Sequence, residues 1–484
     1  MIDPVVTESG ELVIEESSGL RGNVGTFHLF FTTLSYNAPL AISVGFIPAV
    51  IAFGNGVGAP VTVLVVGILT ALFANGFVAM AQRIPRPGGF YAYITASLGR
   101  PIGLSAGFLA FVGYLMAAVS SLTFGGISVR ALMHDTFGGP KIDWWVLSGI
   151  LALAVGVVGY FKLDISAKVL TVLLSLEIIL VMAYNVAVIV KGGAHGLEAS
   201  SFTLHAVTSG SLGLTLLYGI LLFTGYEATV IFRDEARNPK VTIPRATYGF
   251  IFFVTVLYAI GAWVFIQGVG ADNVVEETAS DPTGTFLGSI GQYLGKTALD
   301  LTTLLLCTSI FAAVLAAHNV SSRYLFNLSA DRIFPRWFGV AHSRLQSPHR
   351  ASLAITAISF LGLFVIAISV SDSATLYARL AGGASYVFLL LMGAAAIGAA
   401  RFLIAYPEPL GVKMKHIVAI VIAAVGYIAC VVFATMNFDL LLNSSKALSY
   451  VVVLAIWGVA LCGVLLGVIY RKFRPEVYLR IGRQ

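Results

Sequence analysis

The chain has 484 residues, of which 58% are hydrophobic and only 11% are charged, and its formal net charge is +6. Average soluble domains are about 45–50% apolar and about 25% charged. The composition therefore excludes a soluble enzyme, a disordered protein and a nucleic-acid-binding protein. A mean hydropathy of +0.91 over this length indicates a polytopic membrane protein whose main partner is the lipid bilayer.

Apolar runs recur along the chain at about the 20-residue length that spans a bilayer core. Twelve transmembrane helices are expected, at about 29–52, 61–82, 101–129, 144–161, 169–190, 206–232, 246–271, 301–322, 351–371, 380–400, 417–438 and 447–470. The runs are continuous and do not alternate at period two, which is typical of membrane helices and not of a transmembrane β-barrel. The sequence thus predicts an all-α polytopic membrane protein with 12 transmembrane helices.

The basic residues predict the orientation of these helices. Most of the 29 lysines and arginines lie in the tails and in the loops that follow even-numbered runs. Cytoplasmic loops carry an excess of Lys and Arg, so both termini are expected in the cytoplasm, as tails 1–26 and 471–484 around a membrane domain 27–470. The acidic loop 272–295 is expected outside. The expected location is the plasma membrane, or the inner membrane of a bacterium.

The apolar runs contain two acidic side chains, Glu177 in the fifth run and Glu227 in the sixth. A charge at the centre of a membrane helix costs about 2.5–3.5 kcal/mol on insertion scales, so such residues point to function. The alternative is that each is protonated, or pairs with a neighbouring helix and fixes its packing.

Two runs carry residues that interrupt helices. Gly225 stands two positions before Glu227 in the sixth run, and Pro39 and Pro48 bracket residues 40–45 in the first. Proline removes a backbone donor and frees the carbonyl one turn upstream. Interrupted helices in corresponding positions of two halves indicate an inverted repeat with a substrate site between them. The first and sixth helices are therefore expected to be broken.

Three motifs carry a resemblance to the amino acid-polyamine-organocation (APC) superfamily. They resemble its loop after helix 2, its helix 6 with the following loop, and its loop after helix 8: Pro85-Arg86-Pro87-Gly88-Gly89-Phe90-Tyr91-Ala92-Tyr93, Gly225-Tyr226-Glu227 through Arg237-Asn238-Pro239-Lys240, and Ala330-Asp331-Arg332-Ile333-Phe334-Pro335. The resemblance covers roughly residues 27–470. It implies amino acid transport by alternating access and a five-plus-five inverted repeat. Helices 1–5 would occupy about 27–191, helices 6–10 about 206–400, and two added helices about 417–470.

The resemblance also implies where substrate binds, at unwound backbone in helices 1 and 6. Carried over, these positions are Ala41, Ile42 and Ser43 with Val44 and Gly45 beside them, and Phe223, Thr224 and Gly225 followed by Tyr226 and Glu227. The N-terminus of a half-helix offers free N–H groups and a positive dipole end to a carboxylate, and free carbonyls accept an ammonium group. Pro39 offers a competing break about one turn earlier. Phe223 and Tyr226 could equally be core aromatics, because pockets are lined by the same residue types.

The coupling ion is left open between a proton and sodium. Glu177 is the candidate for proton coupling, because the resemblance places helix 5 near helix 1; the alternative is a permanently protonated residue that donates a hydrogen bond to a neighbouring helix. Thr308 and Ser309 are candidate sodium ligands, although hydroxyls in membrane helices also serve packing.

The expected function is secondary active transport of an amino acid. The alternative within transport is a polyamine or other organic amine, whose cationic nitrogens would meet Glu227 and Glu177. A membrane-embedded enzyme is the competitor from another class, but lone carboxylates without histidine or cysteine partners speak against it. No catalytic residue, metal or cofactor is expected, and no nucleic-acid partner.

Overall fold

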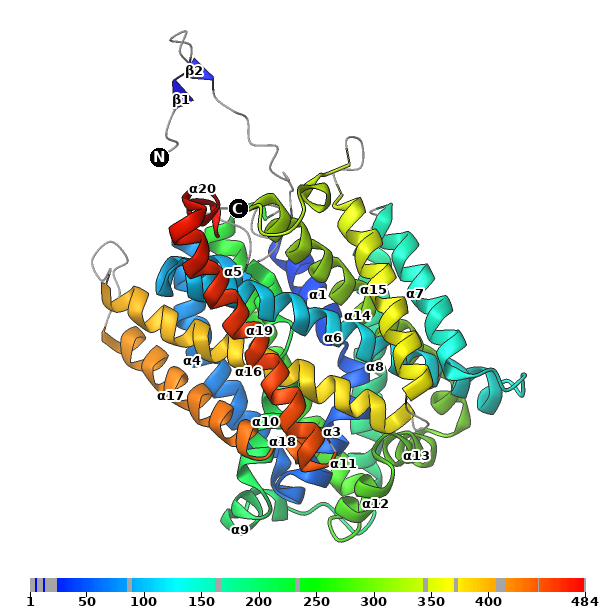
Figure 1. Cartoon of the computed structure of the whole chain (residues 1–484). Helices are drawn as coiled ribbons and strands as arrows, with labels where there is room; N and C mark the ends of the chain where they lie inside the picture. The colour runs from blue at the N-terminus through cyan, green and yellow to red at the C-terminus, as the bar shows by residue number, and fades with distance from the viewer. Residues whose placement is uncertain are drawn as a thin grey trace.

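The computed structural model (Figure 1) describes residues 5–6, 12–13, 24–84, 89–161, 167–230, 236–342, 347–369, 373–405, 414–442 and 444–482. Motif residues 85–88 and 231–235, and most of the tail 1–26, lie outside these ranges. A two-residue strand pair, β1 (Val5–Val6) with β2 (Leu12–Val13), precedes a bundle of helices. The prediction of an all-α polytopic membrane protein is confirmed.

The helices follow one another along the whole chain. Those up to residue 191 are α1 (Thr26–Asn37), α2 (Pro39–Ala41), η1 (Ile42–Phe46), α3 (Ile47–Phe53), η2 (Gly56–Gly58), α4 (Ala59–Arg83), α5 (Gly89–Leu98), α6 (Arg100–Ala131), η3 (Leu132–Thr136), α7 (Trp144–Tyr160) and α8 (Ala167–Lys191). Those after it are η4 (Ser200–Phe202), α9 (Leu204–Thr208), α10 (Leu212–Leu221), η5 (Tyr226–Val230), α11 (Pro239–Val269), α12 (Val274–Ser280), α13 (Pro282–Leu294), α14 (Lys296–Ala330), η7 (Arg336–Gly339), α15 (His349–Ser369), α16 (Ser373–Ala405), α17 (Met414–Met436), α18 (Phe438–Leu442), α19 (Lys446–Phe473) and α20 (Pro475–Arg480).

Within the described residues, 10 helical segments are long and apolar enough to cross a membrane. The other two predicted spans correspond to α7, which has 17 residues, and to the segment 206–232, which is interrupted after α10. The outer faces of the bundle expose large apolar side chains, such as Leu361 on α15 and Leu454 on α19. Such a surface suits lipid. The five-plus-five repeat and its boundaries stay a prediction.

The two ends of the bundle differ in the elements they hold. Helices α5 and α20 lie at one end in Figure 1, and α9, α12 and α13 lie at the other. Helix α12 belongs to the acidic loop 272–295 and α20 to the basic tail 471–484. The bundle therefore separates the two segments that were predicted to face opposite sides of the membrane, while the side that each faces stays a prediction.

The first membrane helix is broken at Ala38. This residue has φ 51° and ψ 72°, a left-handed conformation that costs a non-glycine residue roughly 1–2 kcal/mol. Pro39 follows, and proline disfavours a helical conformation in the residue before it. The chain then resumes as α2 and as the π-helix η1. The expectation that residues 41–43 are unwound is wrong, because the break lies one turn earlier, where Pro39 imposes it.

The sixth membrane helix is also broken. Helix α10 ends at Leu221, residues 222–225 form a turn, and η5 begins at Tyr226. Gly225 has φ +111°, which glycine adopts without the steric cost that a Cβ brings. A Cβ at this glycine would lie 3.1 Å from Cβ of Tyr36 and 3.5 Å from the carbonyl oxygen of Thr33. Glycine thus allows both the turn and the close approach of the sixth helix to the first.

Candidate substrate-binding site

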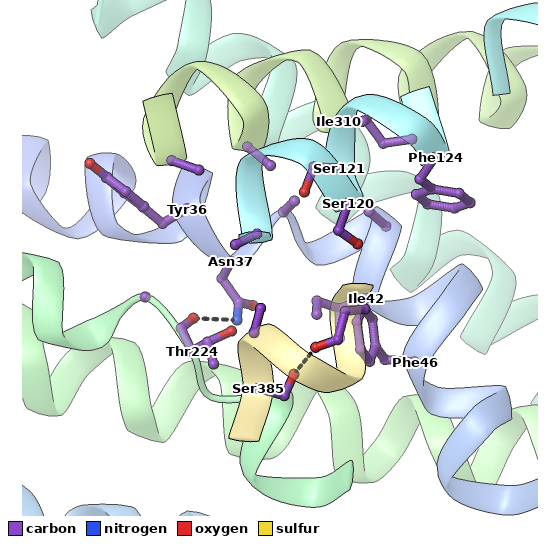
Figure 2. A pocket seen from close by; sticks show the side chains of 18 of the residues that line it. Tyr36, Asn37, Ile42, Phe46, Ser120, Ser121, Phe124, Thr224, Ile310 and Ser385 are labelled. Carbon is purple, nitrogen blue, oxygen red and sulfur yellow. Dashed lines mark hydrogen bonds between the residues drawn. The ribbon is translucent and has the colours of Figure 1, made fainter. Parts of the chain in front are cut away.

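A cavity of about 140 Å³ lies between the two breaks. Its lining comes from α1, α2 and η1, from the turn after α10 and η5, and from α6, α14 and α16 (Figure 2). Helix α6 contacts both α14 and α16, so the wall that faces the breaks is a packed unit. The volume is below the ~300–1,000 Å³ of sites for drug-sized ligands, and suits a small molecule.

On the side of helix 1, the structure brings two of the five predicted residues to the cavity. Ala41 and Ile42 line it, while Ser43, Val44 and Gly45 are not among its lining residues. The hydroxyl of Ser43 donates to the carbonyl of Pro39 at 2.8 Å. This carbonyl lies one turn upstream in the same helix, so the Ser43 hydroxyl already has a local partner.

On the side of helix 6, Thr224, Gly225 and Glu227 line the cavity. Phe223 and Tyr226 are 1% and 0% exposed and are not among its lining residues. The ring of Tyr226 packs edge-on against Phe73 at 6.0 Å between ring centroids. Of the two roles weighed for these aromatics, packing in the core is the one that the geometry supports.

Glu227 caps the second half of the broken sixth helix. Its Oε2 accepts a hydrogen bond from the backbone N–H of Gly225 at 2.9 Å, and its Oε1 accepts one from the hydroxyl of Tyr114 at 3.1 Å. A carboxylate is stabilised at a helix N-terminus by free N–H groups. The side chain that the sequence singled out for its charge therefore holds the break in shape as well as facing the cavity.

Glu177 does not line the cavity, but its side chain lies next to the first break. It is 1% exposed, and its Oε2 accepts a hydrogen bond from the hydroxyl of Ser309 at 2.8 Å. Its carboxylate also faces the backbone N–H of Leu40, just after the break. The carboxyl group of α8 thus joins the restarted first helix to α14, and the Ser309 hydroxyl, a candidate sodium ligand, is engaged with it.

Asn37 is a cavity residue that the sequence analysis missed. Its Nδ2 donates to the carbonyls of Leu222 at 2.8 Å and Thr224 at 3.0 Å, and its Oδ1 accepts from the hydroxyl of Tyr258. Figure 2 shows the Asn37 side chain directed at the turn that carries Thr224. The available signal was a polar residue within an apolar run, two positions before Pro39.

The rest of the lining is aromatic and hydroxylic. Rings of Phe124 and Tyr377 stack at 4.6 Å between centroids, and Tyr36, Ser120, Ser121 and Ser385 supply further hydroxyl groups. Among the described lining residues Glu227 is the single charged one. In the part of the chain that the structure describes, no three His, Cys, Asp or Glu side chains gather where they could hold a metal ion.

The fold and the cavity define a polytopic membrane protein with a small binding site between two interrupted helices. A family model described as amino acid permease matches residues 24–470. The chain belongs to the amino acid permease family, and it is a membrane transporter.

Named relatives agree with this family at low identity. The chain is 24% identical to the low-affinity putrescine importer PlaP of Escherichia coli (strain K12) over 61% of this chain and 65% of the importer. It is 24% identical to a probable GABA permease of Pseudomonas aeruginosa over 74% and 75% of the two chains. It is 26% identical to the serine/threonine exchanger SteT of Bacillus subtilis over 57% and 62%. The chain thus spans less than two thirds of the length of the importer and of the exchanger.

Proposed function

We propose that this protein is a secondary active transporter that moves a small amino acid across the plasma membrane, or the inner membrane of a bacterium, by alternating access. The cavity between the two breaks carries the proposal. It places interrupted backbone, hydroxyl groups and one carboxylate around a space of about 140 Å³. Transport requires rearrangement around this site and no catalysed reaction.

The substrate contacts follow from the lining. Ala41 and Ile42 would flank it on the side of helix 1, and Thr224, Gly225 and Glu227 on the side of helix 6. A substrate ammonium is attracted to the Glu227 carboxylate, and aromatic faces add a cation–π contribution. Relatives that are named for GABA, serine, threonine and putrescine indicate a small amine-bearing substrate.

A carrier of organic amines is the second candidate. One observation favours it: among the described lining residues there is a carboxylate but no Lys, Arg or His to pair with a substrate carboxylate. An amino acid would have to place its carboxylate against backbone N–H groups and hydroxyls, whereas a diamine needs no such partner.

We propose further that transport is coupled to a proton carried by Glu177. Its carboxyl group is buried where the restarted first helix meets α14. A helix that rocks between two arrangements would expose this group to water on one side at a time, which is the requirement for carrying a proton.

Thermal unfolding of the purified protein with L-serine, GABA and putrescine tests the substrate class. A ligand that binds only the folded state raises the free energy of unfolding, by about 2.7 kcal/mol at a concentration of 100 times its Kd. The unfolding temperature rises accordingly. Stabilisation by L-serine or GABA supports an amino acid, and stabilisation by putrescine alone supports the amine carrier. The cavity variant Glu227→Ala should bind the substrate more weakly than the wild type does. Unchanged affinity in this variant would contradict the proposed site.

A further inference from the structure

Three separate helices meet at the side chain of Asn37. This residue is the last of α1 and is 3% exposed. Its amide nitrogen donates to two carbonyls of the turn after α10, and its amide oxygen accepts from Tyr258 of α11. Its amide oxygen and both of its N–H groups are therefore engaged, each with a residue far away in the sequence.

The carbonyls that Asn37 binds lie in the interrupted stretch of helix 6. Leu222 and Thr224 lie in the turn where the helical ladder of α10 has stopped, and carbonyls at a helix end have lost their intrahelical donors. Leaving a buried carbonyl without a donor is destabilising. Asn37 supplies both donors from the matching break in helix 1.

Tyr258 sets the direction of the Asn37 amide. A phenol hydroxyl donates to Oδ1 of Asn37, so the other end of the amide, with its two N–H donors, must face the carbonyls. Tyr258 is 0% exposed and is not among the residues lining the cavity. Its hydroxyl therefore reaches the site through the amide of Asn37.

We propose that Asn37 is a positioning residue that fastens the break of helix 1 to the break of helix 6, with Tyr258 fixing its amide. The tie stabilises those arrangements in which the two breaks are in contact. Without it the population shifts toward arrangements in which the breaks separate and the cavity opens. This tie concerns how the proposed site is held together and is independent of which substrate the site takes.

Thiol accessibility tests the tie without any substrate. Ser385 lines the cavity and is 7% exposed, so Ser385→Cys reports when the cavity opens. The probe is placed in a background in which Cys307, Cys430 and Cys462 are replaced by alanine. A membrane-impermeant maleimide is then applied to each face of the membrane. We expect Asn37→Ala to raise the labelling rate at least about tenfold, because it removes all three hydrogen bonds of the amide and the loss of one buried hydrogen bond alone accounts for about that factor.

Two further variants make the result specific. Asn75→Ala is the matched control, because the amide of Asn75 donates to Ala71 of its own helix at 3.1 Å and joins no two helices; its labelling rate should equal that of the parent. Tyr258→Phe should raise the rate less than Asn37→Ala does, and should add nothing in the Asn37→Ala background, because it acts through the same amide.

The tie is refuted if Asn37→Ala and Tyr258→Phe unfold at the temperature of the parent and label at its rate. Additive effects of the two changes would also contradict it, because the tyrosine would then act by another route. If Asn37→Ala does not purify as a folded protein, the isosteric Tyr258→Phe carries the test alone. Because no substrate enters these measurements, their failure is distinct from a failure of the amino acid assignment.

Discussion

Replacing Glu177 by glutamine separates a proton carrier from a structural acceptor. The side chain accepts a hydrogen bond from the hydroxyl of Ser309 and faces the backbone N–H of Leu40. Glutamine keeps the size and one oxygen acceptor, which can serve Leu40. The Ser309 hydroxyl can rotate and accept from the new amide group. Both contacts survive, so we expect the free energy of unfolding to change by less than about 1 kcal/mol.

Replacing Glu177 by leucine shows how much stability is lost when both contacts are removed. Glu177→Leu removes the buried carboxylate that the hydroxyl of Ser309 bonds and that the N–H of Leu40 faces. An unsatisfied buried donor costs about 1–3 kcal/mol, and Ser309 can recover part of this by turning to a carbonyl of its own helix. Thermal unfolding in detergent should therefore rank the wild type and Glu177→Gln together, above Glu177→Leu.

Uptake into proteoliposomes then tests the coupling. Radiolabelled L-serine, GABA and putrescine are offered under a proton gradient and, separately, under a sodium gradient. We expect Glu177→Gln to lose accumulation driven by the proton gradient, because an amide cannot carry the proton, while exchange of substrate down its own gradient persists. Glu276→Gln, which changes an exposed carboxylate of α12, is the matched control. Unchanged pH-dependent accumulation in Glu177→Gln would refute the reasoning.

A bulky side chain in Gly225→Leu should abolish thermal stabilisation by substrate while the protein still purifies as a monodisperse species, because Gly225 lines the cavity and its φ of +111° and tight approach to helix 1 suit only glycine; a normal response would place the site elsewhere. Single cysteines in Ser280→Cys and Arg480→Cys, both exposed positions, should be labelled from outside and from the cytoplasm respectively, and outside labelling of the second in intact cells would overturn the topology. At the end of the bundle that holds α5 and α20, the hydroxyl of Tyr91 donates to Oδ2 of Asp331 at 2.6 Å, and burial together with Asp331 raises the pKa of Tyr91 well above its usual range. Because the pKa of Tyr91 is higher in the folded than in the unfolded protein, the neutral phenol contributes stability below the unfolded pKa of about 10. This contribution is lost as the pH rises above that value. In thermal unfolding between about pH 8 and 11, the stability of the wild type should thus fall more steeply than that of Tyr91→Phe. Parallel curves would show that the hydroxyl of Tyr91 contributes nothing to the pH dependence.

The sequence by itself determined the features that depend on local chemistry. Bilayer thickness and the composition of the apolar runs predict the membrane helices, with no need to know which helix contacts which. The break in helix 6 follows from Gly225, because a single glycine permits the positive φ of its turn. The break in helix 1 follows from Pro39, whose ring restricts the residue before it. Motif resemblance misplaced this break by one turn, and the proline gave its actual position.

Tertiary structure decided what each side chain at these breaks does. Glu177 and Glu227 stand out in the sequence as costly charges, but only the packing shows that each faces a backbone N–H at a break, that of Leu40 and that of Gly225. Asn37 meets Leu222 across a separation of 185 residues. A contact of this kind depends on how helices pack, and the rotation of a helix about its axis in an apolar run is not encoded by local propensity. The direction in which Tyr226 points, into the core and away from the cavity, was for the same physical reason fixed only by its neighbours in space.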